Sequence, residues 1–128
     1  MPTPPHVLVA EDNDLVSGAM RVLFEETGHR VTTTPSIVAT VSAARAEPVD
    51  LLLLDLGLAD GDGLQVLTQL RSAGAMPRVS VALTGRDEPE VAARCRELGC
   101  TEVLLKPVPA RELIAKAREW LGTVNGER

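Results

Sequence analysis

The sequence is constrained most strongly by a run of leucines that ends in an acidic residue. Residues 51–54 are all leucine, a run too short for a helix, and glycine-rich turn signals follow it within residues 57–63. Such a run is typical of a strand that is buried on both faces of a parallel sheet. Asp55 ends the run, so its carboxylate is expected at the carboxyl edge of the sheet, where open α/β folds bind their ligands.

Apolar runs of this kind alternate along the chain with segments of helical periodicity. We expect strands at residues 7–10, 30–34, 50–54, 79–83 and 102–105, each followed by an amphipathic helix. Asn13 and Ser36 are suited to cap two of these helices, and Pro89 suits the first turn of a third. The alternation predicts an α/β fold with a doubly wound five-stranded parallel sheet and five helices.

Length and composition set the expected size of the domain and its surroundings. With 128 residues, 45% of them hydrophobic, the chain is expected to form a single domain over residues 1–128, with a proline-rich lead at 1–5 and a frayed tail at 122–128. No apolar run reaches the length of a bilayer and the start does not resemble a signal peptide, which predicts a cytoplasmic protein without membrane contact. A net charge of −5 without a basic stripe predicts a protein partner and no nucleic acid.

Polar residues follow four of the predicted strands. They are Glu11 and Asp12 after the first, Asp55 after the third, Thr84 after the fourth and Lys106 after the fifth. On one edge of a parallel sheet, the three carboxylates would repel one another in a partly desolvated cleft unless a cation compensated them. Oxygen ligands with room for water suit Mg²⁺, and Lys106 adds a fixed positive charge. With the Thr84 hydroxyl, these groups are the ones that stabilise phosphoryl transfer to a carboxylate.

The order and spacing of these residues resemble the response-regulator receiver domain of two-component signalling. The resemblance runs through residues 7–13, 53–56, 62–63, 83–85 and 105–107 and so covers essentially the whole chain. It implies a flavodoxin-like fold with strand order 2-1-3-4-5. It also implies that Asp55 accepts a phosphoryl group from a sensor histidine kinase or a histidine phosphotransfer protein. Such a domain is a signalling switch that catalyses only its own phosphorylation and dephosphorylation.

The same resemblance implies roles for the other site residues. Asp12, Asp55 and the backbone carbonyl of Gly57 would hold Mg²⁺ directly, while Glu11 would act mainly through water. Lys106 and Thr84 would contact the phosphoryl oxygens. The domain would then signal by conformational change to a downstream protein that the sequence does not identify.

The chain departs from the family pattern at positions that affect the switch. Leu58 and Ala59 stand where Met and Pro commonly follow the phosphorylated Asp, which is expected to loosen this loop. Val103 stands where an aromatic ring usually moves inward with the Thr, and a valine is small and stiff about its first torsion. We therefore expect phosphorylation to reshape mainly residues 84–89 and to leave the domain a monomer.

Other functions remain open at this point. Because Val103 replaces the usual aromatic residue, the chain could also be a degenerate receiver, which binds partners without phosphate. A small haloacid-dehalogenase-type phosphatase also uses an Asp nucleophile, but it needs a second Asp two residues later, where this chain has Gly57. A calcium loop at residues 60–63 would lack most of its acidic ligands, so loop and capping roles suffice there.

The remaining reactive side chains carry no predicted role. Cys95 and Cys100 lack a second pair for metal binding and are expected to be reduced thiols that behave as small apolar residues. His6 and His29 are expected at the surface or in turns, because neither falls at the carboxyl end of a strand. A stand-alone receiver, a relay shuttle and the receiver of a hybrid kinase would look alike at this length.

Overall fold

The computed structural model describes the backbone of residues 3–125 and the side chains of residues 3–122. Its elements are β1 (His6–Ala10), α1 (Asp14–Glu26), β2 (Arg30–Thr34), α2 (Ile37–Ala46), β3 (Leu51–Asp55), α3 (Leu64–Ala73), β4 (Val79–Thr84), α4 (Pro89–Glu97), β5 (Glu102–Leu105) and α5 (Ala110–Asn125). All strand pairs are parallel, and the sheet order is β2-β1-β3-β4-β5. The predicted fold class and strand order are therefore confirmed.

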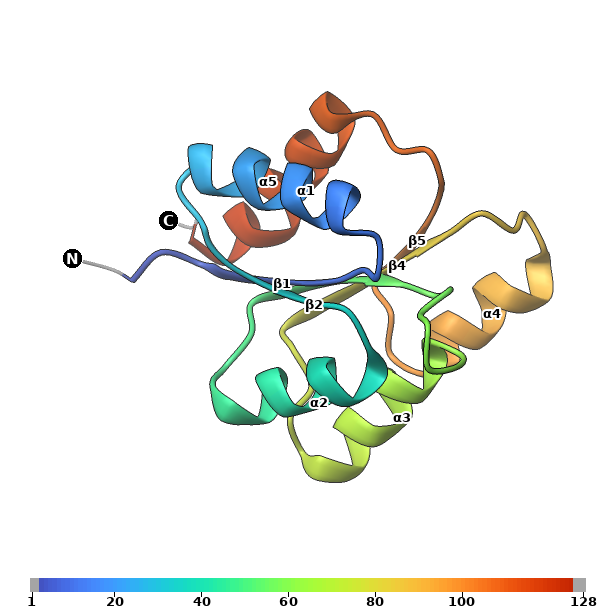
Figure 1. The fold of residues 1–128 in the computed structure, drawn as a ribbon. Helices are drawn as coiled ribbons and strands as arrows, with labels where there is room; N and C mark the ends of the chain where they lie inside the picture. The colour runs from blue at the N-terminus through green and yellow to red at the C-terminus, as the bar shows by residue number, and fades with distance from the viewer. Residues whose placement is uncertain (1–2, 126–128) are drawn as a thin grey trace.

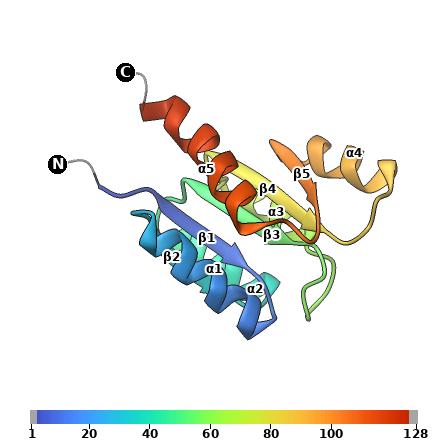
Figure 2. The same ribbon diagram turned by 90° about the horizontal axis from the view of Figure 1, so that it is seen from above.

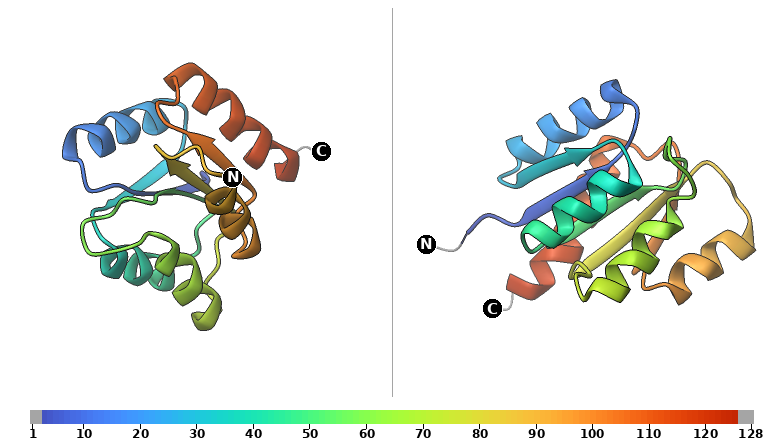
Figure 3. Two further views of the ribbon diagram at one scale, coloured as in Figure 1. Left: turned by 90° about the vertical axis from the view of Figure 1, so that its right-hand side faces the viewer. Right: turned by 60° about the horizontal axis from the view of Figure 1, so that its bottom comes forward.

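Helices cover both faces of the sheet (Figure 1). α1 and α5 lie on one face, and α2, α3 and α4 lie on the other. The view from above shows the strand arrows pointing the same way, so that their carboxyl ends gather along one edge (Figure 2). The two further views show the loops after β3 and β4 at this same edge (Figure 3). Every residue that follows a strand is thereby carried to one end of the molecule.

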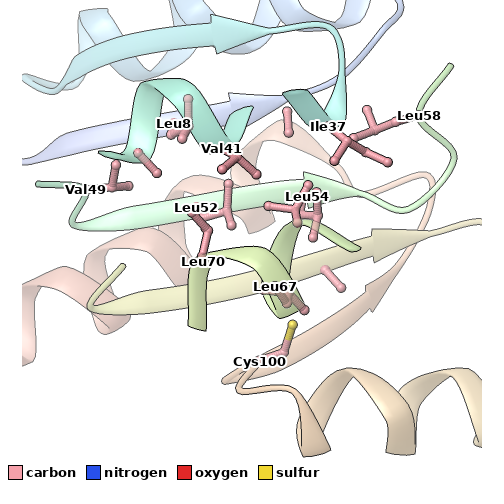
Figure 4. Close-up of a cluster of buried hydrophobic side chains, with 14 of the residues drawn as sticks. Leu8, Ile37, Val41, Val49, Leu52, Leu54, Leu58, Leu67, Leu70 and Cys100 are labelled. Carbon is pink, nitrogen blue, oxygen red and sulfur yellow. The ribbon is translucent and has the colours of Figure 1, made fainter. Parts of the chain in front are cut away.

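The centre of the sheet is β3, whose leucines are all 0% exposed. Because side chains alternate along a strand, Leu52 and Leu54 pack against α2 and α3 on one face, as Figure 4 shows. Leu51 and Leu53 belong to a second cluster, which includes Phe24 of α1 and side chains of α5. Complete burial of each leucine contributes about 1.5–3 kcal/mol to stability. The prediction of a strand buried on both faces is confirmed.

Three helices begin at the residues that were predicted to cap them or to occupy their first turn. The side chain of Asn13 caps α1, that of Ser36 caps α2, and Pro89 occupies the first turn of α4. α5 continues to Asn125, past the point at which the frayed tail was expected to begin. The rest of that tail, residues 126–128, and residues 1–2 of the lead lie outside the described part of the chain.

His6 is not at the surface, so the prediction made for it is wrong. The residue is only 2% exposed at the start of β1. Its Nδ1 lies 3.0 Å from the carbonyl oxygen of Pro48, and its Nε2 lies 2.8 Å from the hydroxyl of Thr32. These contacts join β1 to β2 and to the segment before β3. His6 therefore has a structural role at the amino ends of the strands, away from the edge that carries Asp55.

The two cysteines are free and buried, as predicted. Burial raises the pKa of the Cys100 thiol to about 12. It also raises the pKa of Cys95, which packs in the same apolar cluster. Both side chains are therefore protonated at neutral pH and behave as small apolar residues.

Gly63, directly before α3, generates a prediction about stability. A Cβ atom at this position would lie 2.8 Å from both the carbonyl oxygen of Asp55 and the Cα of Leu56, which is closer than atoms can pack. We expect Gly63→Ala to lower the free energy of unfolding by about 1–3 kcal/mol, because the backbone of the loop must move. Urea unfolding of both proteins measures the difference.

The matched control is Gly18→Ala in α1, where a Cβ atom would have no heavy atom within 4 Å. This substitution is expected to raise stability by about 0.5–1 kcal/mol, since alanine favours a helix interior. Wild-type stability in Gly63→Ala would contradict the close approach of the two backbone segments.

Candidate functional site

Acidic residues at the ends of β1 and β3 converge in the structure. Carboxylate oxygens of Glu11, Asp12 and Asp55 lie within 4.8 Å of one another. Parallel pairing of β1 with β3 causes this, because Ala10 lies opposite Leu54 and the next residues of both strands are the acids. Glu11 and Asp55 are only 5% and 6% exposed, whereas Asp12 is open to solvent. The predicted acidic cluster is therefore assembled.

The electrostatics of the cluster disfavour full ionisation. Burial raises the pKa of Glu11, and the nearby charge of Asp55 raises it further. The backbone N–H of Asn13, which donates to Glu11 Oε2 at 3.1 Å, and the positive charge of Lys106 act in the opposite direction. Like charges in a partly desolvated site cost free energy that a bound cation would recover.

Lys106 brings its positive charge directly over the cluster. Its Nζ lies 3.2 Å from Asp55 Oδ1 and 3.9 Å from Glu11 Oε1. The residue follows β5, and its backbone N–H donates to the carbonyl oxygen of Thr84 at 2.7 Å. That bond joins the two loops that border Asp55, so the placement of the ammonium group depends on the pairing of β4 with β5.

Thr84 completes the group of residues around Asp55. It is the last residue of β4 and is 5% exposed, and its hydroxyl oxygen accepts the N–H of Arg86 at 3.0 Å. A cleft of about 600 Å³ is lined by Asp55, Leu56, Gly57, Asp62, Leu64, Thr84, Gly85, Arg86, Val91 and Lys106. The phosphoacceptor candidate, the hydroxyl and the ammonium group thus share one open cavity.

The loop between β3 and α3 has anchors in its backbone and in one apolar side chain. Gly57 donates its N–H to Asp55 Oδ1 at 3.1 Å, and Gly63 donates its N–H to the carbonyl oxygen of Leu56 at 3.0 Å. Leu58 is only 6% exposed and packs in the apolar cluster under α2 and α3. Leu58 therefore serves as an apolar anchor of this loop, and the expectation that Leu58 and Ala59 loosen it relative to Met and Pro stays a prediction.

Asp60 is a contact that sequence reasoning did not identify. Its carboxylate accepts the N–H groups of Ile37 and Val38, which begin α2. Loop and capping roles were expected for residues 60–63, but a cap is normally sought directly before its own helix. Asp60 lies 23 positions after Ile37, the first residue of the helix that it caps, so no local pattern could point to this pairing.

The fifth strand is tied to the last helix. Glu102 accepts a hydrogen bond from Lys116 Nζ at 2.8 Å and another from Trp120 Nε1 at 3.1 Å. The hydrogen bond to the Glu102 carboxylate raises the pKa of Lys116. Val103, the next residue, is partly buried against the apolar cluster on the other face. The strand in which Val103 replaces the family's usual aromatic residue is thus held to α5 by polar contacts of Glu102.

The donor set fits a small divalent cation. Three carboxylates from the ends of two neighbouring strands supply hard oxygen ligands. Exposure of Asp12 leaves room for the water molecules that Mg²⁺ usually keeps.

Comparison with known proteins identifies the family. The sequence model of the response regulator receiver domain matches residues 7–118, so the chain belongs to this family of two-component signalling proteins. Within it, the transcriptional regulatory protein AfsQ1 of Streptomyces coelicolor is 32% identical over 97% of this chain and 53% of its own length. The polar-differentiation response regulator DivK of Brucella anthropi is 28% identical over 93% of this chain and 98% of its own length.

The chain spans about half the length of the curated transcriptional regulators that it matches. Among solved structures, the receiver domain of the sensor histidine kinase PA1611 of Pseudomonas aeruginosa aligns with a TM-score of 0.81 at 24% identity. The alignment covers 93% of this chain and 98% of that one, which confirms the receiver fold.

Within the described part of the chain, no helix combines the length and the apolar character needed to cross a bilayer.

The geometry of the cluster generates a prediction about metal binding. We expect Asp12→Ala to weaken Mg²⁺ binding about tenfold, or about 1.4 kcal/mol, because Asp12 offers an accessible carboxylate. Glu11→Ala is expected to have a smaller effect, since that side chain is buried and accepts the Asn13 N–H. Titration of Mg²⁺ against the amide signal of Gly57 measures both affinities.

Asp14→Ala is the matched control, because Asp14 is a neighbouring acid at the start of α1 and is not part of the cluster. Equal losses of affinity in the variants at residues 11, 12 and 14 would contradict the assignment.

Saturating Mg²⁺ should also raise the melting temperature of the chain, since the ion binds the folded chain preferentially.

Proposed function

We propose that this receiver domain accepts a phosphoryl group on Asp55 from the phosphohistidine of a sensor histidine kinase or a histidine phosphotransfer protein. The observation that carries the proposal is the ammonium group of Lys106, which lies 3.2 Å from an oxygen of Asp55 in a cleft that Thr84 also lines. A carboxylate nucleophile, a fixed cation and a hydroxyl around one cavity form the set that phosphoryl transfer needs.

Each residue has a defined part in the transfer. An oxygen of Asp55 attacks phosphorus, and the bond from phosphorus to the histidine nitrogen of the donor breaks. Lys106 places positive charge beside the phosphoryl oxygens as negative charge moves onto them. The Thr84 oxygen accepts the N–H of Arg86, which leaves its own proton available for donation to a phosphoryl oxygen.

Mg²⁺ is the proposed cofactor and would neutralise the carboxylates and the phosphoryl oxygens. Asp12, Asp55 and the Gly57 carbonyl would hold it, with Glu11 acting mainly through water. The acidic cluster supports this proposal, as does the magnesium ion coordinated in the active-site cleft of the PA1611 receiver domain.

We further propose that the output is read by a protein partner. Several relatives are transcriptional regulators, but this chain spans only about half of their length. The net charge of −5 supports the expectation that this domain itself makes no contact with nucleic acid. A receiver that works without phosphate is less well supported, because Asp55, Thr84 and Lys106 line one cleft beside the acidic cluster. A dehalogenase-type phosphatase is disfavoured by Gly57, which supplies no general acid.

The phosphoacceptor assignment predicts one labelled residue. Incubation with acetyl phosphate and Mg²⁺ should add one phosphoryl group to the wild-type chain and none to Asp55→Asn, as measured by intact-protein mass. Lys106→Ala should bind Mg²⁺ but react about 10²-fold more slowly, because the charge that stabilises the transferring group is lost.

The control for the phosphorylation experiment is Asp62→Asn, because Asp62 lines the same cleft but lies outside the acidic cluster. An asparagine there can still accept the N–H of Leu64, so the start of α3 is preserved. Phosphorylation of Asp55→Asn at the wild-type rate would refute the assignment.

The contacts of β5 predict which residues change their structure when Asp55 is phosphorylated. Formation of the beryllofluoride adduct, whose fluorides stand in for phosphoryl oxygens, should shift amide signals mainly in residues 84–89 and the start of α4. Residues 103–120 should shift little, because Val103 has no ring to move and Glu102 holds Lys116 and Trp120 of α5. Sedimentation should show a monomer before and after.

Val103→Phe tests the reason for this local response, since it restores an aromatic side chain at the same position. The variant is expected to spread the shifts into β5 and α5. Large shifts throughout residues 103–120 of the wild-type chain, together with dimer formation, would refute the local response.

A further inference from the structure

The start of α2 is capped twice, once from its own chain and once from the loop after β3. The first N–H groups of a helix have no partner within the helix. Ser36 supplies the ordinary cap, since its Oγ accepts the N–H of Ala39 at 3.1 Å. Asp60 supplies the second cap, since its Oδ1 accepts the N–H of Ile37 at 2.8 Å and its Oδ2 lies 3.4 Å from the nitrogen of Val38.

The loop that contains Asp60 is held in place by a small number of contacts. Its base is closed by the N–H of Gly63, which donates to the carbonyl oxygen of Leu56 at 3.0 Å. Residues 57–62 form the arc outside this base. The arc meets α2 through the buried side chain of Leu58, which packs in the same cluster as Ile37, and through the carboxylate of Asp60.

The position of Gly57 depends on these contacts. Gly57 lies between Asp55, to which its N–H donates, and the Leu58 anchor. Its carbonyl belongs to the peptide that leads into the arc, so the direction of that carbonyl follows from where Leu58 and Asp60 hold the chain. The Ile37 N–H lowers the pKa of Asp60, and the carboxylate is therefore ionised at neutral pH.

We infer that Asp60 is a positioning residue for Mg²⁺ binding: by bonding to the start of α2, it holds the arc of residues 57–62 that carries the Gly57 carbonyl. The inference rests on the proposed function, in which that carbonyl is a ligand of Mg²⁺. Asp60 itself does not touch the metal, because its carboxylate is engaged with the backbone of Ile37 and Val38. The magnesium site would thereby be coupled to a helix on the far side of the loop.

The alternative is that Asp60 only stabilises α2. Ser36 separates the two roles, because it caps the same helix from within its own segment. Ser36→Ala should lower the free energy of unfolding and leave Mg²⁺ affinity unchanged. Asp60→Ala should lower stability too, and should in addition weaken Mg²⁺ binding by about tenfold, as is typical when a residue that orients a ligand is lost.

The conservative variant Asp60→Asn separates position from charge. An asparagine keeps one acceptor oxygen, which can accept the Ile37 N–H as Asp60 Oδ1 does and lacks only the second acceptor near Val38. This variant is therefore expected to keep most of the Mg²⁺ affinity. Affinities are measured on the full chain by titrating Mg²⁺ against amide shifts. Hydrogen exchange without metal provides the second readout, in which Asp60→Ala should speed exchange at Ile37 and Val38 and at residues 57–61.

The outcomes distinguish this inference from the proposed function. Unchanged Mg²⁺ affinity in Asp60→Ala would overturn the inference, and so would an equal loss in Ser36→Ala, which would mean that helix capping alone matters. An equal loss in Asp60→Asn and Asp60→Ala would also overturn it, because long-range charge would then be the cause. If Asp12→Ala does not weaken binding, the proposed metal site itself fails.

Discussion

Burial of β3 on both faces is the constraint on which the rest of this structure depends. The strand needs one helical layer on each side, and the parallel connections that provide these layers bring all strand ends to one edge. Asp55 is carried into this edge at 6% exposure, and the pairing of β1 with β3 places Glu11 beside it. The acidic cluster is thus a consequence of how the core packs. Its repulsion is partly offset by Lys106 and leaves a site that favours a bound cation.

The anchors around the cleft are unevenly distributed. The loop after β3 is held by Leu58 and Asp60, and β5 is held to α5 through Glu102. Residues 85–90, after β4, are all exposed. The ion pair between Arg86 and Glu88, at 2.7 Å, lies at the surface, where such a pair contributes little to stability. The part of the rim with the weakest attachment is therefore the part that directly follows Thr84.

Much of the fold and most of the candidate site could be predicted from the sequence, because both depend on local patterns. Apolar runs followed by turn residues marked the strands, and Asn13 and Ser36 marked the starts of two helices. Parallel topology predicted that Glu11, Asp12 and Asp55 lie on one edge of the sheet, and the pairing of β1 with β3, which the resemblance to the family implied, brings them together. The exposure of helix faces was less predictable: Val38 of α2 is apolar and yet 73% exposed, because the neighbours that cover a helix are not encoded in its own periodicity.

The strand pattern, the caps and the identity of the residues at the carboxyl edge could be predicted from the sequence, since each of these is set by residues close together in the chain. The burial of His6, the anchoring of the loop by Leu58 and the capping of an earlier helix by Asp60 became visible only in the folded chain. The physical reason is the same in each case. The partners are brought together by the packing of separate βα units, and no local pattern records which units become neighbours.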